Sequence, residues 1–272
     1  MAGFQLASSA DAVFPLALGF LAGITVLMGL LFMLAFRGRL SETKVAFLQA
    51  VAGGVLAYLA METGHSAAEY VEELAKWETA GEFLIATVVT TAAMMATLAV
   101  LSYVEQNIST LRGLRPSFLV ATIIAVAFGV HNVGEGFAIA AALMGGYVAQ
   151  AYLFAIGFAV HNFTEGFGIA GPVIADRGLK PRLSTLTLLS LLAGLPVVLG
   201  VAVYYAGVNS GLFISTLNTS ATASIVYAML HVNLSAMGRL GGVKSLRFWS
   251  AIVTGVAVAF LTESIILFSG VH

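Results

Sequence analysis

The chain has 272 residues, of which 60% are hydrophobic and 9% are charged, and its formal net charge is −1. Soluble domains carry about 25% charged residues, so this composition excludes an ordinary soluble protein and indicates a polytopic membrane protein. The absence of a basic block excludes a nucleic-acid-binding surface. The absence of cysteine excludes disulfides and thiolate metal sites.

Eight stretches of the chain reach the length of about 20 apolar residues that a helix needs to cross the hydrocarbon. The residues before the first stretch lack the basic segment of a cleavable signal peptide, and we interpret them as a short tail. The connections are short, which predicts a single all-α polytopic membrane domain over residues 1–272. The predicted spans are residues 13–36, 45–65, 82–103, 117–143, 148–174, 184–207, 211–236 and 248–270.

The positions of Lys and Arg predict the orientation, because these residues concentrate in cytoplasmic loops. The loops after the first, third, fifth and seventh spans hold all but one of the 12 basic residues. They are Arg37, Arg39, Lys44, Arg112, Arg115, Arg177, Lys180, Arg182, Arg239, Lys244 and Arg247. Lys76 alone falls on the other side, so we expect both termini to be extracytoplasmic.

The opposite side of the membrane is predicted to carry an acidic connection between the second and third spans. Two interpretations stay open for this stretch: a solvated helical loop, or a vestibule that concentrates cations. The acidic residues are Glu69, Glu72, Glu73, Glu78 and Glu82.

A polar motif occurs twice inside otherwise apolar spans, as HNVGEG from His131 and as HNFTEG from His161. A carboxylate within the bilayer is costly, and it is a functional-site hypothesis by default. Residues four apart lie on nearly the same face of a helix. Each motif therefore presents a histidine and a glutamate together, with the asparagine beside them: His131, Asn132 and Glu135, then His161, Asn162 and Glu165.

Imidazole, carboxylate and amide oxygen without thiolate suit borderline divalent cations such as Zn²⁺, Fe²⁺, Mn²⁺ or Co²⁺. One helix supplies half of a coordination sphere, so two adjacent helices can supply the whole. Glycines surround both motifs, and small residues allow transmembrane helices to approach closely. We therefore expect glycine to help bring the two half-sites together; the residues are Gly129, Gly134, Gly136, Gly157, Gly166 and Gly168.

These motifs resemble those of the ZIP (Zrt/Irt-like) family of divalent metal transporters, most closely its bacterial zinc-uptake branch, whose fourth and fifth helices carry His-Asn-x-Pro-Glu-Gly. The resemblance implies a first metal site at His131, Glu135, His161 and Glu165. It implies a second site at Asn132 and Asn162, bridged by both glutamates. It further implies that spans 1–3 and 6–8 are pseudosymmetric around spans 4 and 5.

The function implied by the resemblance is metal transport into the cytoplasm across the plasma membrane. Zinc is the expected substrate, and iron, manganese or cobalt are alternatives. The metal would be the transported substrate and not a prosthetic group, the protein would not be an enzyme, and its other contacts would be membrane lipid and, as a homodimer, a second copy.

Three departures from the family pattern affect these expectations. Gly134 and Thr164 occupy the positions of the motif prolines, and Val197 stands where relatives with a complete second site have a glutamate. The second site is therefore expected to be weakened or absent. The loop after the third span has no histidine, which argues against a metal sensor there.

Four further polar residues are candidates for the transport pathway, although each is also explained by an interfacial position or a buried hydrogen bond. They are Glu62, His65, His231 and Glu263. Alternatives to transport are a metal-binding membrane sensor, a transport-inactive relative, and an intramembrane metalloenzyme. The chain lacks the His-Glu-x-x-His motif of a zinc protease, which disfavours the last.

Overall fold

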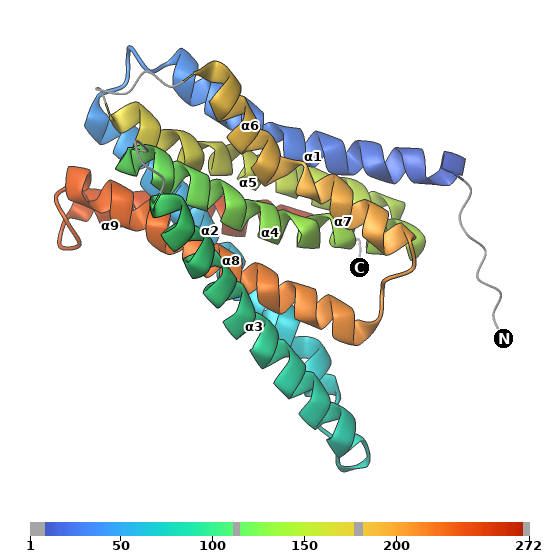
Figure 1. Cartoon of the computed structure of the whole chain (residues 1–272). Helices are drawn as coiled ribbons and strands as arrows, with labels where there is room; N and C mark the ends of the chain where they lie inside the picture. Colours follow the sequence, from blue (N-terminus) through green and yellow to red (C-terminus); the bar gives the residue numbers. More distant parts are fainter. Residues whose placement is uncertain (1–8, 111–114, 177–181, 269–272) are drawn as a thin grey trace.

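The structure, a computed structural model, describes residues 9–110, 115–176 and 182–268. Throughout these ranges the regular secondary structure is helical, which confirms the predicted all-α class (Figure 1). The helices are α1 (Ser9–Ala35), α2 (Glu42–Glu73), α3 (Ala80–Ser109), α4 (Pro116–Met144), α5 (Val148–Ala175), α6 (Leu183–Gly194), α7 (Pro196–Tyr205), α8 (Gly211–Met237) and α9 (Leu246–Phe268), with short 3-10 turns η1 (Trp77–Thr79) and η2 (Gly238–Leu240).

Seven segments of the described chain are long and apolar enough to cross a membrane, so the protein is a multi-pass helical membrane protein. They are α1, α2, α3 with η1, α4, α6 with α7, α8 with η2, and α9. The fifth predicted span, α5, is not among them. At 28 residues it has the length to cross, but it carries the polar residues of the second motif.

The largest differences from the predicted spans are at α2, α3 and the sixth span. Helix α2 continues to Glu73 and α3 to Ser109, because hydropathy marks only the apolar part of a helix that extends beyond it. The sixth span is divided into α6 and α7 at Pro196, which has no N–H for the helical hydrogen bond. Residues 269 and 270 of the last predicted span lie outside the described residues.

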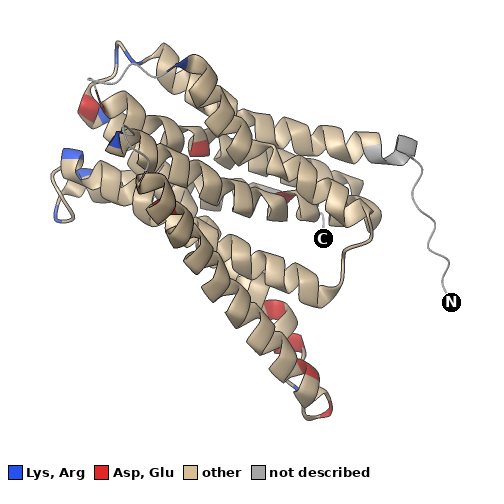
Figure 2. Ribbon diagram, viewed as in Figure 1, with Lys and Arg blue, Asp and Glu red and all other residues tan. Residues whose placement is uncertain are grey.

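Basic residues gather at one end of the helix bundle, where Glu42 and Asp176 also lie, and a group of acidic residues gathers at the opposite end (Figure 2). The basic end holds the described connections α1–α2 and α8–α9 and the first residues of α4 and α6, whereas the acidic end is the tip where α2 meets α3. Arg112, Arg177 and Lys180 lie outside the described residues. The predicted segregation of charge is therefore present for the residues that the structure describes.

Helices α4 and α5 lie in the middle of the bundle and pack against each other. Helix α1 packs on α5, α7 on α4, and α2 and α8 pack against each other and against the central pair. The buried apolar core draws side chains from most of these helices and includes Val26, Leu56, Phe128, Ile169 and Ile225. The two polar motifs are thus enclosed by other helices on both sides.

The expectation that the motif glycines bring α4 and α5 together holds for Gly168 but is wrong for Gly136 and Gly166. A Cβ on Gly168 would lie 3.4 Å from the ring of Phe128 on α4. A Cβ on Gly136 would lie 2.0 Å from the backbone oxygen of Val197 on α7. A Cβ on Gly166 would lie 2.5 Å from the backbone nitrogen of Leu30 on α1. Gly136 and Gly166 therefore seat the flanking helices α7 and α1 against the central pair.

Candidate metal centre

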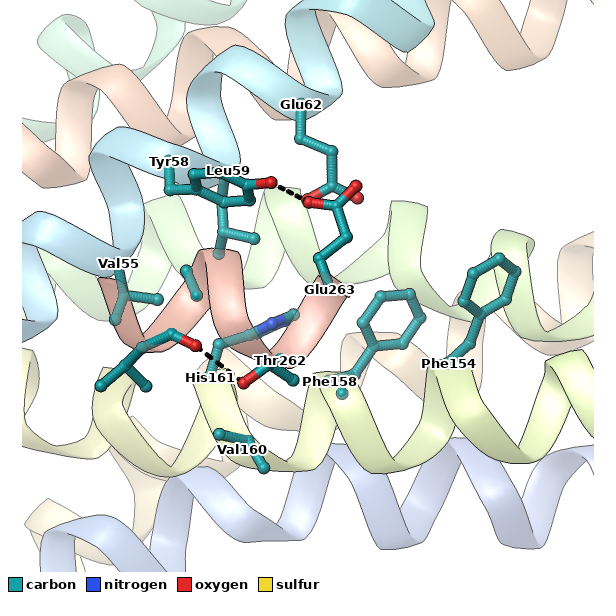
Figure 3. Close-up of a pocket in the computed structure, with 13 residues that line it drawn as sticks. Val55, Tyr58, Leu59, Glu62, Phe154, Phe158, Val160, His161, Thr262 and Glu263 are labelled. Atoms are coloured by element: carbon teal, nitrogen blue, oxygen red, sulfur yellow. Dashed lines mark hydrogen bonds between the residues drawn. The ribbon is translucent and has the colours of Figure 1, made fainter. Parts of the chain in front are cut away.

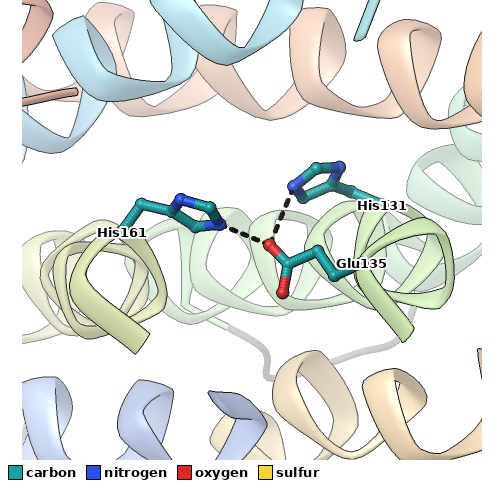
Figure 4. A group of neighbouring side chains, drawn as sticks. All are labelled: His131, Glu135 and His161. Carbon is teal, nitrogen blue, oxygen red and sulfur yellow. Dashed lines mark hydrogen bonds and ion pairs between the residues drawn. The ribbon is translucent and has the colours of Figure 1, made fainter. Parts of the chain in front are cut away.

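Three motif side chains converge between α4 and α5: His131 and Glu135 from α4, and His161 from α5 (Figure 4). Nε2 of His161 lies 2.5 Å from Oε1 of Glu135, and Nε2 of His131 lies 3.3 Å from the same oxygen. The four-residue spacing on α4 places its histidine and glutamate on one face, as predicted. The histidine rings lie on the side of Glu135 that faces α2 and α8 (Figure 4).

Each asparagine of the repeated motif holds the glutamate of the other helix. Nδ2 of Asn162 donates to Oε2 of Glu135 at 2.7 Å, and Nδ2 of Asn132 donates to Oε2 of Glu165 at 3.2 Å. Both asparagine side chains also donate to a backbone carbonyl of a flanking helix. This reciprocal arrangement joins the two motifs across the helices.

The group of three could hold a metal ion. Its ligand atoms lie within 4.8 Å of one another. Zinc binds nitrogen at about 2.0–2.1 Å, so two ligands of a tetrahedral ion are about 3.3 Å apart. The distance between His131 and Glu135 already has this value, whereas the distance between His161 and Glu135, 2.5 Å, is shorter than it.

Several polar atoms in this region are buried and have no hydrogen-bonding partner among the described residues. The exposed fraction of Glu165 is 1% and that of Asn132 and of Asn162 is 0%. An unpaired buried polar atom costs about 1–3 kcal/mol, and a bound cation would relieve this cost at an acceptor. The unpaired atoms include Nδ1 of His131, Oδ1 of Asn132, Oδ1 of Asn162 and Oε1 of Glu165.

Glu165 is buried close to the centre but does not belong to the group of three. Its described contact is the hydrogen bond from Asn132, and its other oxygen is unpaired. The structure therefore brings together three of the four residues predicted for a first metal site. It leaves Glu165 with Asn132, one of the two asparagines that were predicted to form the second site.

The helix-6 position of the predicted second site contributes no carboxylate, since Val197 is fully buried in apolar packing. The interruption between α6 and α7, next to Val197, instead offers a hydrogen-bond acceptor. At the junction of α6 and α7 the backbone oxygen of Ala193 accepts a hydrogen bond of 2.9 Å from Nδ2 of Asn132. On the opposite side, Nδ2 of Asn162 donates to the backbone oxygen of Ala22 on α1 at 3.4 Å.

Both central helices run without interruption through the positions where the family has proline. A Cβ on Gly134 would have Ala221 Cβ at 3.8 Å and Asn218 Oδ1 at 4.0 Å as its nearest atoms, which is ordinary contact. We therefore expect Gly134→Ala to leave metal binding unchanged and to keep or raise the unfolding temperature, since alanine favours a helix over glycine by up to about 1 kcal/mol. Calorimetry in detergent checks both, and a loss of binding would show that a bend at this position is required.

The four residues predicted as candidates for the transport pathway lie in different parts of the structure. Glu62 and Glu263 line one cavity together with His161. His65 lies on the exposed surface of α2. His231 lies outside the centre: its Nε2 is 3.2 Å from Oε1 of Glu105 on α3, and its Nδ1 is 2.9 Å from the backbone oxygen of Tyr227.

Sequence reasoning missed two residues that hold candidate carboxylates or histidines. Glu105 accepts hydrogen bonds from Tyr227 and His231, and Tyr58 donates to Glu263. Tyr58 stands four residues before Glu62 on α2, so helical spacing could have placed both on one face. Glu105 lies in the polar end of α3 beyond the predicted span, where no motif marked it.

No protein-family model matches the chain, and no curated protein matches it significantly. The protein is a multi-pass helical membrane protein with a buried group of two histidines and one glutamate between its central helices.

Proposed function

We propose that the protein transports divalent transition-metal ions across a membrane and that His131, Glu135 and His161 bind the ion on its way. The observation that carries this proposal is the convergence of three metal-ligating side chains between two central membrane helices, each within 4.8 Å of the others. Intramembrane ionisable groups that face the interior of a helix bundle are typical of ion pathways. The resemblance of the two motifs to the ZIP family supports the same function.

The proposed direction is toward the cytoplasm, with zinc as the first substrate to test and iron, manganese and cobalt as alternatives. The supporting observation is the separation of charge, because the basic end is expected on the cytoplasmic side and the acidic tip outside. In this orientation all eight spans cross, both termini are extracytoplasmic, and a cation approaches through a region of negative potential. The plasma membrane, pseudosymmetry of the flanking spans and a homodimer belong to the same proposal.

The proposal is tested by reconstituting the purified protein in proteoliposomes and following uptake of Zn²⁺, Fe²⁺, Mn²⁺ and Co²⁺ together with equilibrium binding. We expect saturable uptake of at least one of these ions. Binding without uptake would instead support a metal-binding sensor or a transport-inactive relative, a reading that the valine at position 197 keeps open. Absence of both would refute the proposal.

Metal binding should weaken as the pH falls. Imidazole coordinates a metal only when it is neutral, so protons compete with the ion for His131 and His161. We therefore expect the affinity for zinc to fall as the solution is made more acidic. Titration calorimetry at several pH values measures this trend, and an affinity independent of pH would contradict coordination by the histidines.

A further inference from the structure

Helix α5 passes two cavities, one on each side of the candidate metal centre. Before His161 in the chain, a cavity of about 100 Å³ between α2, α5 and α9 includes Phe158 and the ring of His161 in its wall (Figure 3). Where α5 ends, a second cavity of about 530 Å³ lies at the basic end of the bundle, and we call it the basic-end cavity. Its lining includes Ser117, Pro172, Ala175 and Ser235.

One face of α5 runs from the metal centre to the basic-end cavity. Residues 161, 164, 168, 171 and 175 are alternately three and four apart, so they lie on this face. After His161 the face carries a threonine, two glycines and an alanine, and the alanine lines the basic-end cavity. At about 1.5 Å per residue, an ion that followed this face from His161 to Ala175 would travel about 21 Å.

The side chain of Gln49 on α2 lies across this face and is fully buried, with an exposed fraction of 0%. Its Nε2 donates to the backbone oxygen of Val232 at 3.2 Å and to Oγ of Ser235, both on α8. The same side chain rests on Gly171 of α5, where an added Cβ would lie 2.5 Å from Oε1 of Gln49. Gln49 therefore bridges α2, α8 and α5 directly behind Ser235, at the inner end of the basic-end cavity.

Hydrogen bonding determines which atom of this amide faces α5. The backbone oxygen of Val232 can only accept, so the amide atom beside it must be the nitrogen of Gln49. Oε1 is therefore directed toward Gly171, and it is buried without a hydrogen-bonding partner among the described residues. A buried unpaired acceptor is costly, and a cation or a water molecule relieves that cost whereas an apolar group does not.

An apolar layer lies between Gln49 and the metal centre. A Cβ on Gly168 would lie 3.3 Å from Cγ2 of Val232 and 3.4 Å from the ring of Phe128. Both of these side chains have an exposed fraction of 0%. Phe128 stands three residues before His131 on α4, on the side of the basic end. The route along α5 is therefore filled first by this layer and then by the amide of Gln49.

From these contacts we infer that Gln49 is an inner gate: it closes the passage from the metal centre to the basic-end cavity, and its amide oxygen receives the ion that leaves toward the basic end. This inference rests on the proposed function. A neutral amide suits such a role, because a ligand without charge binds a divalent cation more weakly than a carboxylate and does not retain it. Opening requires α2 and α8 to separate where Nε2 of Gln49 bonds to α8.

The first test measures closure by thiol labelling, which is possible because the chain has no cysteine of its own. Val232→Cys places a thiol directly behind Gln49, and Ser117→Cys places one in the basic-end cavity. In nanodiscs, a charged, water-soluble thiol reagent should label Ser117→Cys rapidly and Val232→Cys slowly. Adding Gln49→Ala should raise the labelling rate of Val232→Cys by at least about tenfold and leave that of Ser117→Cys unchanged.

Ala86→Cys on α3 is the control for a general loosening of the fold, because Ala86 is buried away from this passage. Its thiol should stay unlabelled with and without Gln49→Ala. An increase there as large as that at Val232→Cys would overturn the inference.

The second test measures the role of the amide oxygen with Gln49→Leu, which keeps a side chain of similar volume but removes the acceptor. Val232→Cys should remain slowly labelled in this variant, and titration calorimetry should show unchanged affinity for Zn²⁺ at the metal centre. The maximal rate of Zn²⁺ uptake into proteoliposomes should fall by at least about tenfold, because the departing ion meets an apolar group.

Three results would overturn the inference while leaving the proposed function intact, provided that the wild type takes up zinc. They are rapid labelling of Val232→Cys with Gln49 present, unchanged labelling after Gln49→Ala, and a normal maximal rate in Gln49→Leu. A wild type that neither binds nor transports a divalent ion would instead refute the proposed function, and with it the role of Gln49 in release.

Discussion

Replacement of Glu135 by alanine should abolish high-affinity binding of divalent metal and stop uptake. Oε1 of Glu135 is the atom that both histidines approach, at 2.5 Å from His161 and 3.3 Å from His131. Loss of a residue that merely supports a metal ligand costs about 10–100-fold in affinity, so loss of the shared ligand should cost at least about 100-fold. Zinc titration and proteoliposome uptake measure the two effects.

The comparison with Glu165→Ala makes this prediction specific to the observed geometry. Glu165 lies outside the group of three and is held by Asn132, so its removal should reduce zinc affinity less than removal of Glu135. Thr164→Val is the control for a buried polar change at the same depth, because its hydroxyl bonds to the backbone oxygen of His161 in its own helix. Equal losses for Glu135→Ala and Glu165→Ala would show that both carboxylates bind the first ion.

Most of the helices could be predicted from the sequence because crossing a membrane demands long apolar runs. The fifth span differs from the others, because α5 was predicted to cross but is not among the seven segments that are long and apolar enough to do so. The extensions of α2 and α3 could not be placed, because beyond the apolar run only hydrogen bonding and local propensity decide where a helix ends. The division at Pro196 had a visible cause, but helices with an internal proline can also continue, as α5 does at Pro172.

The members of the candidate site could be predicted, whereas their partners could not. Helical spacing determines that His131 and Glu135 share a face, and this holds in the structure. Which groups meet across two helices depends on how the helices are rotated and shifted against each other. The pairing of each asparagine with the glutamate of the other helix, and the separation of Glu165 from the group of three, follow from that packing.

The glycines of the motifs illustrate the same limit. Their small size predicted close helix contact, but the sequence does not say which helix approaches. Gly166 faces α1, and on α1 it meets Gly29, where a Cβ would lie 1.9 Å from the backbone oxygen of Phe163. The backbones of α1 and α5 therefore touch directly, within the polar motif of α5 itself, and this contact holds α5 against α1.

Gly29→Ala should accordingly destabilise the protein severely, by more than about 3 kcal/mol, and lower the yield of folded protein in detergent. At 1.9 Å the added methyl group would overlap a backbone atom, so a change of rotamer cannot relieve the clash and α1 and α5 must separate. Gly38→Ala is the matched control, because a Cβ on Gly38 would have nothing within 4 Å, and it should behave as the wild type. Thermal unfolding measures both variants. Since α1 and Ala22 also hold Asn162, the separation should weaken zinc binding in any Gly29→Ala protein that remains folded, and normal stability with normal binding would show that the two backbones are not in contact.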